Sequence, residues 1–295
     1  MLTINTADLK PAELQSYLQY AIAPRPICFV STIDQQGNVN LSPFSFFNIF
    51  SINPPICVFS PSRRVRDNTT KHSLENILEV PECVINIVNY DMVQQVSLSS
   101  VEYPKGVNEF IKAGFTQLPS DLVRPPRVAE SPVQMECLIR QVISLGEDAG
   151  AGNLVLAEIK RIYIDENILD ESGKIDQVKI DLVARLGGDW YCRVGSENLF
   201  EVAKPVRTIG IGIDSIPEAI RNSMILTGNN LGQLGNVESL PSDEEIAAFG
   251  LDPELRQILD ATIGDSKTRE RELHVHAKKL LEAKDVSKAW KVLLS

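Results

Sequence analysis

The sequence predicts a mainly β protein of α+β type, an antiparallel β-barrel with peripheral helices and a C-terminal helical extension. Two observations support this prediction. Short apolar and β-branched runs recur between turn signals as far as residue 194, without the alternation of strands and helices that marks a parallel sheet. Past about Pro205, apolar residues recur at helical spacing instead. We therefore expect two domains, a barrel over 1–204 and a helical extension of unknown role over 205–295.

The composition bounds the function before any motif is considered. A chain of 295 residues, 43% hydrophobic and 23% charged, is typical of a soluble globular protein with one substantial core. Its net charge of -10 argues against nonspecific binding to nucleic acid or to an anionic membrane. No apolar run approaches the ~20 residues of a membrane-spanning helix. The first residues also lack the pattern of a signal peptide, so we expect a cytoplasmic protein.

The cysteines and histidines do not predict a metal site. His274 and His276 would lie on opposite faces of a helix, so we expect a solvated pair and not two ligands. No C-x-x-C pair is present. The cysteines are odd in number, widely spaced and set in apolar runs, which is typical of reduced, buried thiols. They are Cys28, Cys57, Cys83, Cys137 and Cys192.

The stretch 24–55 carries the main functional signal. Residues 27–32 form an apolar run, Gly37 lies in a turn, and residues 39–41 are expected to pair back as a hairpin. Polar residues then recur every third position, interleaved with aromatic rings. The polar set is Ser42, Ser45, Asn48 and Ser51, and the rings are Phe44, Phe46, Phe47 and Phe50.

Such a segment suits flavin mononucleotide (FMN). The flavin ring needs a flat apolar slot with amide hydrogen bonds at its edge, the ribityl chain needs small polar partners, and the phosphate needs hydroxyls and a cation. The alternative is a phenylalanine-rich strand and turn packed in a core with solvated serines. Composition alone favours this alternative.

The remaining elements of the barrel follow in order. A short helix is expected over 11–20, a buried strand over 56–60, and a second helix after a polar loop, with Ser73 as its N-cap. Residues 82–88 predict a strand and 91–100 a helix, and 103–132 predict a surface excursion with a short helix near 108–113.

Two strand-like runs, 133–145 and 154–164, flank the sequence G-E-D-A-G-A-G-N. Because a strand and not a helix follows this loop, a hairpin turn is favoured over a phosphate-binding loop. A last strand-like run covers 183–194. In the extension, a connector from Arg207 leads into a helix expected near Pro217. Further helices are expected at 243–249, 252–261 and 277–294, with Ser242 and Asp252 as caps.

Three motifs resemble the flavin reductase-like proteins with an FMN-binding split barrel. The first is A-P-R-P-I-C-F-V-S-T at 23–32, with N-L-S-P-F-S-F-F-N at 40–48 and N-P-P at 53–55. The second, K-H-S-L-E-N-I at 71–77, resembles K-D-T-x-x-N-I, and R-L-G-G-D-W-Y at 185–191 resembles R-L-G-G-x-x-Y. The motifs stand in the family's order and the likeness covers about residues 10–200, so nothing is carried over to 205–295.

The resemblance implies a six-stranded antiparallel Greek-key barrel that forms a homodimer and holds FMN near the subunit interface. Within the first motif, the matching positions line the flavin ring and the ribityl chain or lie at the end of the preceding strand. The ring and ribityl positions are Ser45, Phe46, Phe47 and Asn48, and the strand-end positions are Ser31 and Thr32.

The other matching positions concern the phosphate and the closing element. Ser60 matches the hydroxyl before the phosphate loop, and Lys71 and Ser73 match the phosphate anchors; a cation and hydroxyl at a helix start would serve a phosphate well. His72 stands where the family has an acidic residue, and Arg185 and Tyr191 match the closing element. For each of these residues an ordinary structural role is the alternative: a solvated lysine, a packed strand, an ion pair or an interface aromatic.

The resemblance implies an NAD(P)H-dependent oxidoreductase that passes a hydride to flavin. Since the cofactors carry this chemistry, no catalytic acid or base is expected. One alternative is a flavoredoxin-like FMN electron carrier without a nicotinamide site, and another is an interaction protein whose extension binds a partner. An electron-acceptor protein is a further possible partner. The sequence does not distinguish NADH from NADPH.

Overall fold

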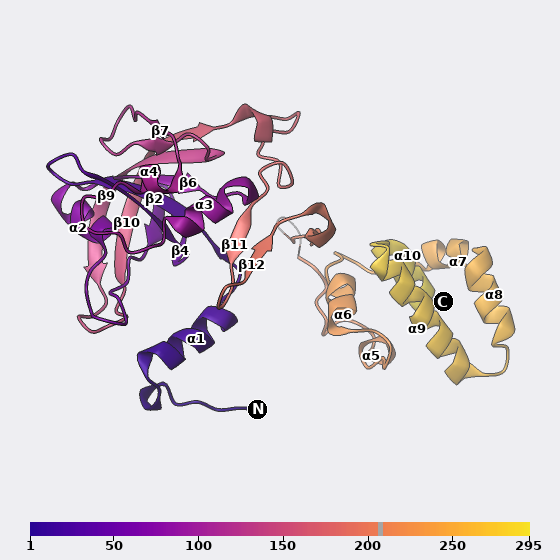
Figure 1. Cartoon of the computed structure of the whole chain (residues 1–295). Coiled ribbons are helices and arrows are strands. Elements are labelled where there is room, and N and C mark those ends of the chain that lie inside the picture. The colour runs from indigo at the N-terminus through magenta and orange to yellow at the C-terminus, as the bar shows by residue number, and fades with distance from the viewer. Residues whose placement is uncertain (206–208) are drawn as a thin grey trace. The chain divides into compact units, whose positions relative to one another are not determined.

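The computed structural model describes residues 1–205 and 209–295 (Figure 1). The chain divides into two compact units, Met1–Phe200 and Glu201–Ser295. Arg207 and Thr208, at the start of the expected connector, lie outside the described residues.

The first unit contains a large antiparallel sheet, which confirms the α+β class with a dominant sheet. Its seven strands run in the order β3-β2-β6-β9-β10-β5-β4, and every neighbouring pair is antiparallel. The edge strands β3 and β4 are separated in the chain by Ser45 and Phe46 alone, so the sheet curls into a barrel, although β3 and β4 are not paired with one another. The strands are β2 (Cys28–Ile33), β3 (Val39–Phe44), β4 (Phe47–Ile52), β5 (Pro55–Phe59), β6 (Glu82–Ile87), β9 (Val133–Ser144) and β10 (Asn153–Ile164).

The expected count of six strands was one too low. The additional strand is β4, because Phe47–Ile52 continues the chain in extended form and pairs with β5 across a two-residue turn. The predicted hairpin of β2 and β3 is confirmed, with Ser31 opposite Leu41. The predicted hairpin of β9 and β10 is also confirmed.

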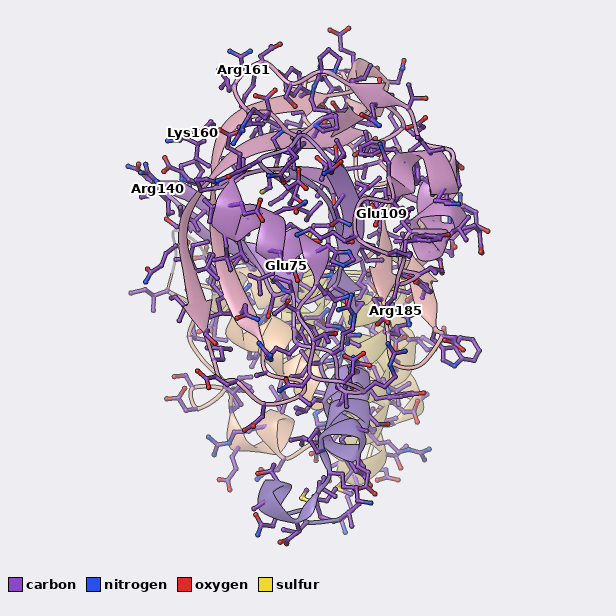
Figure 2. The ribbon with its side chains drawn as sticks, turned by 60° about the vertical axis from the view of Figure 1, so that its left-hand side comes forward. Glu75, Glu109, Arg140, Lys160, Arg161 and Arg185 are labelled. Atoms are coloured by element: carbon purple, nitrogen blue, oxygen red, sulfur yellow. The ribbon has the colours of Figure 1, made fainter. Side chains whose placement is uncertain are left out.

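The interior of the barrel is apolar. Phe44 and Phe59 pack ring to ring at 5.3 Å within a cluster that also contains four of the five cysteines. All five cysteines are free; Cys192 is half-buried and the other four are buried. Charged side chains project instead from the outer face of the β9–β10 hairpin, where Arg140 and Lys160 pair with Glu158 and Arg161 pairs with Asp121 (Figure 2).

Helices cover the other face of β2. Phe29 meets Phe115 edge to face at 5.1 Å in a second cluster, which includes residues of α3 (Val93–Leu98) and α4 (Glu109–Ala113). These helices match the expected positions. The excursion that carries α4 also forms the short strands β7 (Gln117–Leu118) and β8 (Arg127–Val128).

Helix α2 (His72–Glu79) packs against β2 and begins two residues earlier than expected. The backbone of Lys71 caps it, so the prediction of Ser73 as the N-cap was wrong. The Ser73 hydroxyl donates instead to Asn40 Oδ1 at 2.6 Å, because the early start turns this side chain into the protein. A three-stranded sheet of β1 (Arg25–Pro26), β11 (Val183–Arg185) and β12 (Tyr191–Arg193) completes the unit, together with α1 (Pro11–Ala21).

The second unit is helical, around a core centred on Trp290. This indole is 1% exposed and its Nε1 donates to the carbonyl of Leu234 at 3.1 Å. The caps Ser242 and Asp252 are confirmed. The helices are α5 (Glu218–Arg221), α6 (Gly228–Gly235), α7 (Asp243–Phe249), α8 (Pro253–Ala261), α9 (Ser266–Glu282) and α10 (Val286–Leu293).

Helix α9 differs from expectation in two ways. It begins at Ser266 and not near residue 277, because Asp265 caps it through the backbone N–H of Thr268. The prediction of a solvated histidine pair was wrong: His274 is buried in this unit, and burial lowers its pKa. His276 Nδ1 lies 3.7 Å from a carboxylate oxygen of Glu254. Within the described part of the chain, no helix has the length and apolarity needed to cross a membrane.

Candidate functional site

A cleft of about 960 Å³ lies in the first unit. This volume is at the upper end of the range for small-molecule and cofactor sites. Its walls come from α1, from β1, from β4 and β5, from the loop 60–66 with Lys71, and from the tip of the β9–β10 hairpin. Six of the predicted site residues line it: Ser45, Phe46, Phe47, Asn48, Ser60 and Lys71.

One part of the cleft is apolar and aromatic. Phe46 and Phe50 are 45% and 70% exposed, and they line the cleft together with Val58 and Leu154. Asn48 of β4 and Val58 of β5 are cross-strand partners and therefore lie on one face of the sheet. Phe46 directly precedes β4, and Phe50 lies at its bulge. Asn48 adds a polar group here: its side-chain oxygen accepts the N–H of Ile49 at 2.8 Å. A flat ring with a polar edge would find complementary groups on this wall.

The part of the cleft at Lys71 is positively charged, in contrast to the aromatic wall. Its ammonium lies 5.8 Å from the centre of the Phe44 ring, and no hydrogen bond or ion pair to a described residue satisfies it. Burial, reinforced by the charge of Arg64 and opposed by that of Glu102, lowers the pKa of Lys71. A half-buried cation without a protein partner is a group that an anionic ligand would satisfy.

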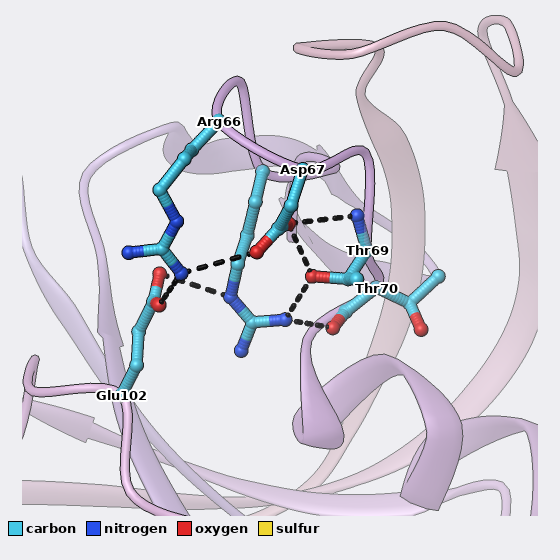
Figure 3. A network of polar contacts seen from close by, with 6 residues as sticks. Arg66, Asp67, Thr69, Thr70 and Glu102 are labelled. Atoms are coloured by element: carbon cyan, nitrogen blue, oxygen red, sulfur yellow. Dashed lines mark hydrogen bonds and ion pairs between the residues drawn. The ribbon is translucent and has the colours of Figure 1, made fainter.

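The loop before Lys71 carries three arginines, and a network of polar contacts holds two of them, Arg64 and Arg66 (Figure 3). Arg64 Nε donates to Glu102 at 2.9 Å, while its Nη1 donates to Thr69 Oγ1 at 2.8 Å and to the carbonyl of Thr70. Arg66 Nη2 donates to the same Glu102 at 2.6 Å. The network therefore fixes two guanidinium groups at the rim of the cleft.

Two cations of the cleft lie outside the charge balance of this network. Within the network, Arg64 and Arg66 pair with the carboxylates of Asp67 and Glu102. Arg63 and Lys71 also line the cleft, and neither forms an ion pair with a described residue. The surplus is two positive charges, which matches one phosphate group near its second ionisation. The Thr69 hydroxyl and backbone N–H, together with Arg66, lower the pKa of Asp67 to about 2. The carboxylate therefore stays ionised at neutral pH, and the surplus persists.

The tip of the β9–β10 hairpin closes the same end. The backbone N–H of Asn153 donates to Ser60 Oγ at 3.2 Å, and Arg63 N–H donates to the carbonyl of Ala151 at 2.8 Å. A Cβ added at Gly152 would lie 2.8 Å from Ser60 Oγ, so only glycine lets the strand approach this closely. The glycine-rich loop is thus a hairpin, as predicted, and its Gly150 and Gly152 also line the cleft, which the sequence analysis missed.

Helix α1 forms a wall with no buried residue of its own. Leu14, Leu18 and Ile22 line the cleft. The helix is held at its C-terminal end by Arg25, whose Nη1 donates to the carbonyls of Gln19 and Ile22 at 2.6 and 2.5 Å.

The glycines of the closing element allow α1 to pack there. A Cβ at Gly187 would lie 2.3 Å from the ring of Tyr20, and one at Gly188 would lie 2.6 Å from its hydroxyl. These two positions therefore admit the tyrosine of α1 only while they carry no side chain.

The other six predicted site residues do not line the cleft. The hydroxyls of Ser31, Thr32 and Ser73 are used within the protein: Ser31 donates to the carbonyl of Pro126 at 2.5 Å, Thr32 accepts from Asn76 at 3.1 Å, and Ser73 bonds Asn40. These bonds fit the structural alternative considered for the two strand residues. A direct role in ligand binding stays a prediction for all three.

His72, Arg185 and Tyr191 lie elsewhere. His72 borders a hollow of about 10 Å³ together with Asp34 and Lys105, which has room for little more than a water molecule. The guanidinium of Arg185 stacks on Tyr191 at 4.5 Å from the ring centre. Arg185 is also the cross-strand partner of the cleft residue Arg25.

The first unit of the chain is similar to known proteins. Residues 20–179 match the family model for the flavin reductase like domain. An uncharacterized protein from Aquifex aeolicus is 35% identical over 176 residues, which cover 60% of this chain and 87% of that protein.

Two solved structures extend the comparison. Nitrilotriacetate monooxygenase component B from Bacillus cereus is 29% identical, with a TM-score of 0.64 over 68% of this chain and 98% of that chain. A split barrel domain protein from Shewanella frigidimarina is 25% identical, with a TM-score of 0.59 over 69% of this chain and 100% of that one. Each match covers about two thirds of this chain and nearly all of the solved structure.

Proposed function

Because the chain belongs to the family of flavin reductase-like domains, we propose that its cleft binds FMN and that the protein is an NAD(P)H-dependent flavin oxidoreductase. One observation carries this proposal. A single cleft combines an aromatic wall with two cations, Arg63 and Lys71, that form no ion pair with a described residue. A ligand with a flat ring at one end and a phosphate at the other is complementary to both.

The lining residues suit the parts of FMN. Phe46 and Phe47 would cover the ring, Asn48 and Ser45 would serve its polar edge and the ribityl chain, and Ser60 with Lys71 would bind the phosphate. Bound FMN would supply the hydride-accepting chemistry. The protein's part is to align the rings, exclude water and balance charge, which needs no acid–base residue. Ser31, Thr32 and Ser73 would support the site through their buried hydrogen bonds.

We also propose that the protein is a homodimer. Strand β4 is the last strand of the sheet, and its Ile49, Phe50 and Ile52 are 52%, 70% and 78% exposed. An apolar edge strand left open invites association with another chain. Phe50 also lines the cleft, so a second copy at this edge would border the site. Sedimentation velocity tests this directly: Phe50→Lys should shift a dimer to a monomer.

The free cysteines, four of them buried, are compatible with a reducing compartment, and we propose a cytoplasmic location. We further propose that the two compact units correspond to a flavin-binding domain over 1–204 and a separable helical extension over 205–295. Deleting 205–295 should leave FMN binding intact if the extension is separable.

Anaerobic titration of the FMN-loaded chain with NADH and with NADPH tests the activity. The proposal predicts bleaching of the flavin absorbance at 1 equivalent of one or both nicotinamides. A chain that binds FMN but is not reduced at a useful rate would be an electron carrier, and a chain that takes up no FMN would defeat the proposal altogether.

A further inference from the structure

Arg25 lines the cleft beside α1, and Arg185, which does not line the cleft itself, is its cross-strand neighbour; neither has a counterion among the described residues. Arg25 on β1 and Arg185 on β11 are directly paired across two antiparallel strands. Residues paired in this way project from the same face of a sheet, where like charges destabilise one another. Among the described residues, no carboxylate oxygen lies within 4.0 Å of either guanidinium group. Figure 2 labels Arg185.

Arg25 is the more constrained of the two. It is 7% exposed, and its Nη1 and Nη2 donate to three backbone carbonyls, those of Gln19, Ile22 and Leu186. A guanidinium has five N–H donors, so two remain, and Nε is buried without any partner. Burial and then the charge of Arg185 lower the pKa of Arg25. Three backbone carbonyls stabilise the Arg25 cation, and no carboxylate among the described residues forms an ion pair with it.

Arg185 has its donors free. Its guanidinium lies flat on Tyr191, 4.5 Å from the ring centre, and it makes no side-chain hydrogen bond to any described residue. Stacking fixes the plane of the guanidinium and leaves its edge open. A flat, oriented, uncompensated arginine is well suited to a group with two anionic oxygens.

These cations are separate from the phosphate end described above. Lys71 and the arginines of its loop follow β5, whereas Arg25 and Arg185 come from the small sheet that holds α1. The charge surplus at Lys71 matches the single phosphate of FMN. A nicotinamide dinucleotide brings its own diphosphate, whose two negative charges need cations that FMN does not use.

We propose that Arg25 and Arg185 form a second anion site, which binds the diphosphate of the nicotinamide dinucleotide at the α1 side of the cleft. This proposal rests on the proposed function. The pair would position the reductant while FMN occupies the remainder of the cleft. Arg25 would act mainly through its charge, since it also anchors α1, and Arg185 would supply the accessible donors.

Arg185→Gln is the informative variant because the Arg185 side chain makes no hydrogen bond to any described residue. Arg193→Gln is its matched control: Arg193 lies on the neighbouring β12 and stacks on Tyr90 at 3.9 Å, but Asp181 neutralises it through bonds of 2.7 and 2.8 Å. Arg185→Lys keeps the charge and loses the two-pronged geometry, so it should fall between wild type and Arg185→Gln.

The test is calorimetric titration of the FMN-loaded, oxidised chain with inorganic pyrophosphate, and in parallel with NAD⁺ and NADP⁺. We expect Arg185→Gln to weaken pyrophosphate binding about tenfold, the size of one charge-assisted hydrogen bond. The FMN affinity should change by less than about twofold, and Arg193→Gln should match wild type in both measurements. Wild-type binding should weaken as salt is raised.

Two results would overturn the proposal: pyrophosphate binding that Arg185→Gln leaves unchanged, or pyrophosphate that binds only by displacing FMN, which would put it at Lys71. The same titration without FMN separates this idea from the proposed function. If the chain fails to bind FMN, pyrophosphate binding that depends on Arg185 would still support the anion site. Failure to bind either FMN or pyrophosphate would refute both the anion site and the proposed function.

Discussion

Replacing Lys71 by methionine is the sharpest perturbation of the phosphate end of the cleft. Methionine keeps most of the length and the apolar stem of lysine and removes only the charge. Because the ammonium has no partner among the described residues, the change breaks no hydrogen bond or ion pair within the protein. Any effect on FMN binding then reports the missing charge.

The size of the effect follows from the neighbours. Arg64 and Arg66 both pair with Glu102, and Arg66 also pairs with Asp67, so these carboxylates partly neutralise the two arginines. No described carboxylate pairs with Lys71, and its hydrogen bond to a phosphate should contribute about 2 kcal/mol to the free energy of FMN binding, within the range for charged partners. That corresponds to an affinity for FMN about 30-fold weaker.

The variant should also fold at least as well as wild type. The lowered pKa of Lys71 means that folding disfavours its charged form, so at neutral pH the ammonium opposes folding until a ligand binds. The free energy of unfolding of the flavin-free Lys71→Met chain should therefore equal or exceed that of wild type. Denaturant titration of both chains measures it.

The affinity assay is quenching of FMN fluorescence at equilibrium, and the control is Lys105→Met. Lys105 belongs to the same unit but lies outside the cleft lining and pairs with Glu75 at 3.4 Å. Equal FMN affinities for Lys71→Met and wild type would refute the assignment of the phosphate end. An equal loss in both variants would point to a long-range charge effect.

Three further predictions follow from other parts of the chain. Asp67→Asn should lower the free energy of unfolding above about pH 4, and the difference from wild type should disappear as the pH falls toward 2, because the pKa of Asp67 is about 2 in the folded chain against an ordinary 3.8. Denaturant titrations of both chains from pH 7 downward measure this difference, and a difference independent of pH would contradict the prediction. Trp290→Ala should cost the helical unit about 3–5 kcal/mol while FMN affinity stays the same, and calorimetry with FMN titration would expose coupling of the units if both changed. Burial raises the pKa of Cys57 to about 11, so at pH 8 a thiol reagent should modify the native chain at half-buried Cys192 first; rapid labelling of Cys57, located by peptide mapping, would show that the barrel core opens.

The sequence predicts the barrel well where local pattern decides the structure. The hairpins, α3, α4 and the caps Ser242 and Asp252 follow from periodicity and turn chemistry, which act over a few residues. Strand β4 was missed because its polar and aromatic residues resemble a binding loop, and only pairing with β5 reveals it as a strand. Ser73 was misplaced because Asn40, distant in sequence, outcompetes the helix end for its hydroxyl.

The site was predicted in part for the same reason. The predicted residues at 45–48, at Ser60 and at Lys71 all line the cleft. They lie on or next to β4 and β5 and on the loop that follows β5, so local sequence pattern was enough to find them. Arg25 and the wall of α1 depend on contacts across more than 160 residues, such as the bond from Arg25 to Leu186, which no local pattern encodes. A signal was present for the loop arginines: R-R-V-R stands just before Lys71, and a cluster of cations beside a predicted phosphate anchor could have been included.

A paired calorimetric titration with FMN and riboflavin shows whether one cleft holds an aromatic ring and a phosphate at once. The two ligands share the ring and the ribityl chain and differ only in the phosphate. We expect one FMN to bind per chain and riboflavin to bind at least about tenfold more weakly. Equal affinities, or heat from neither ligand, would contradict this expectation.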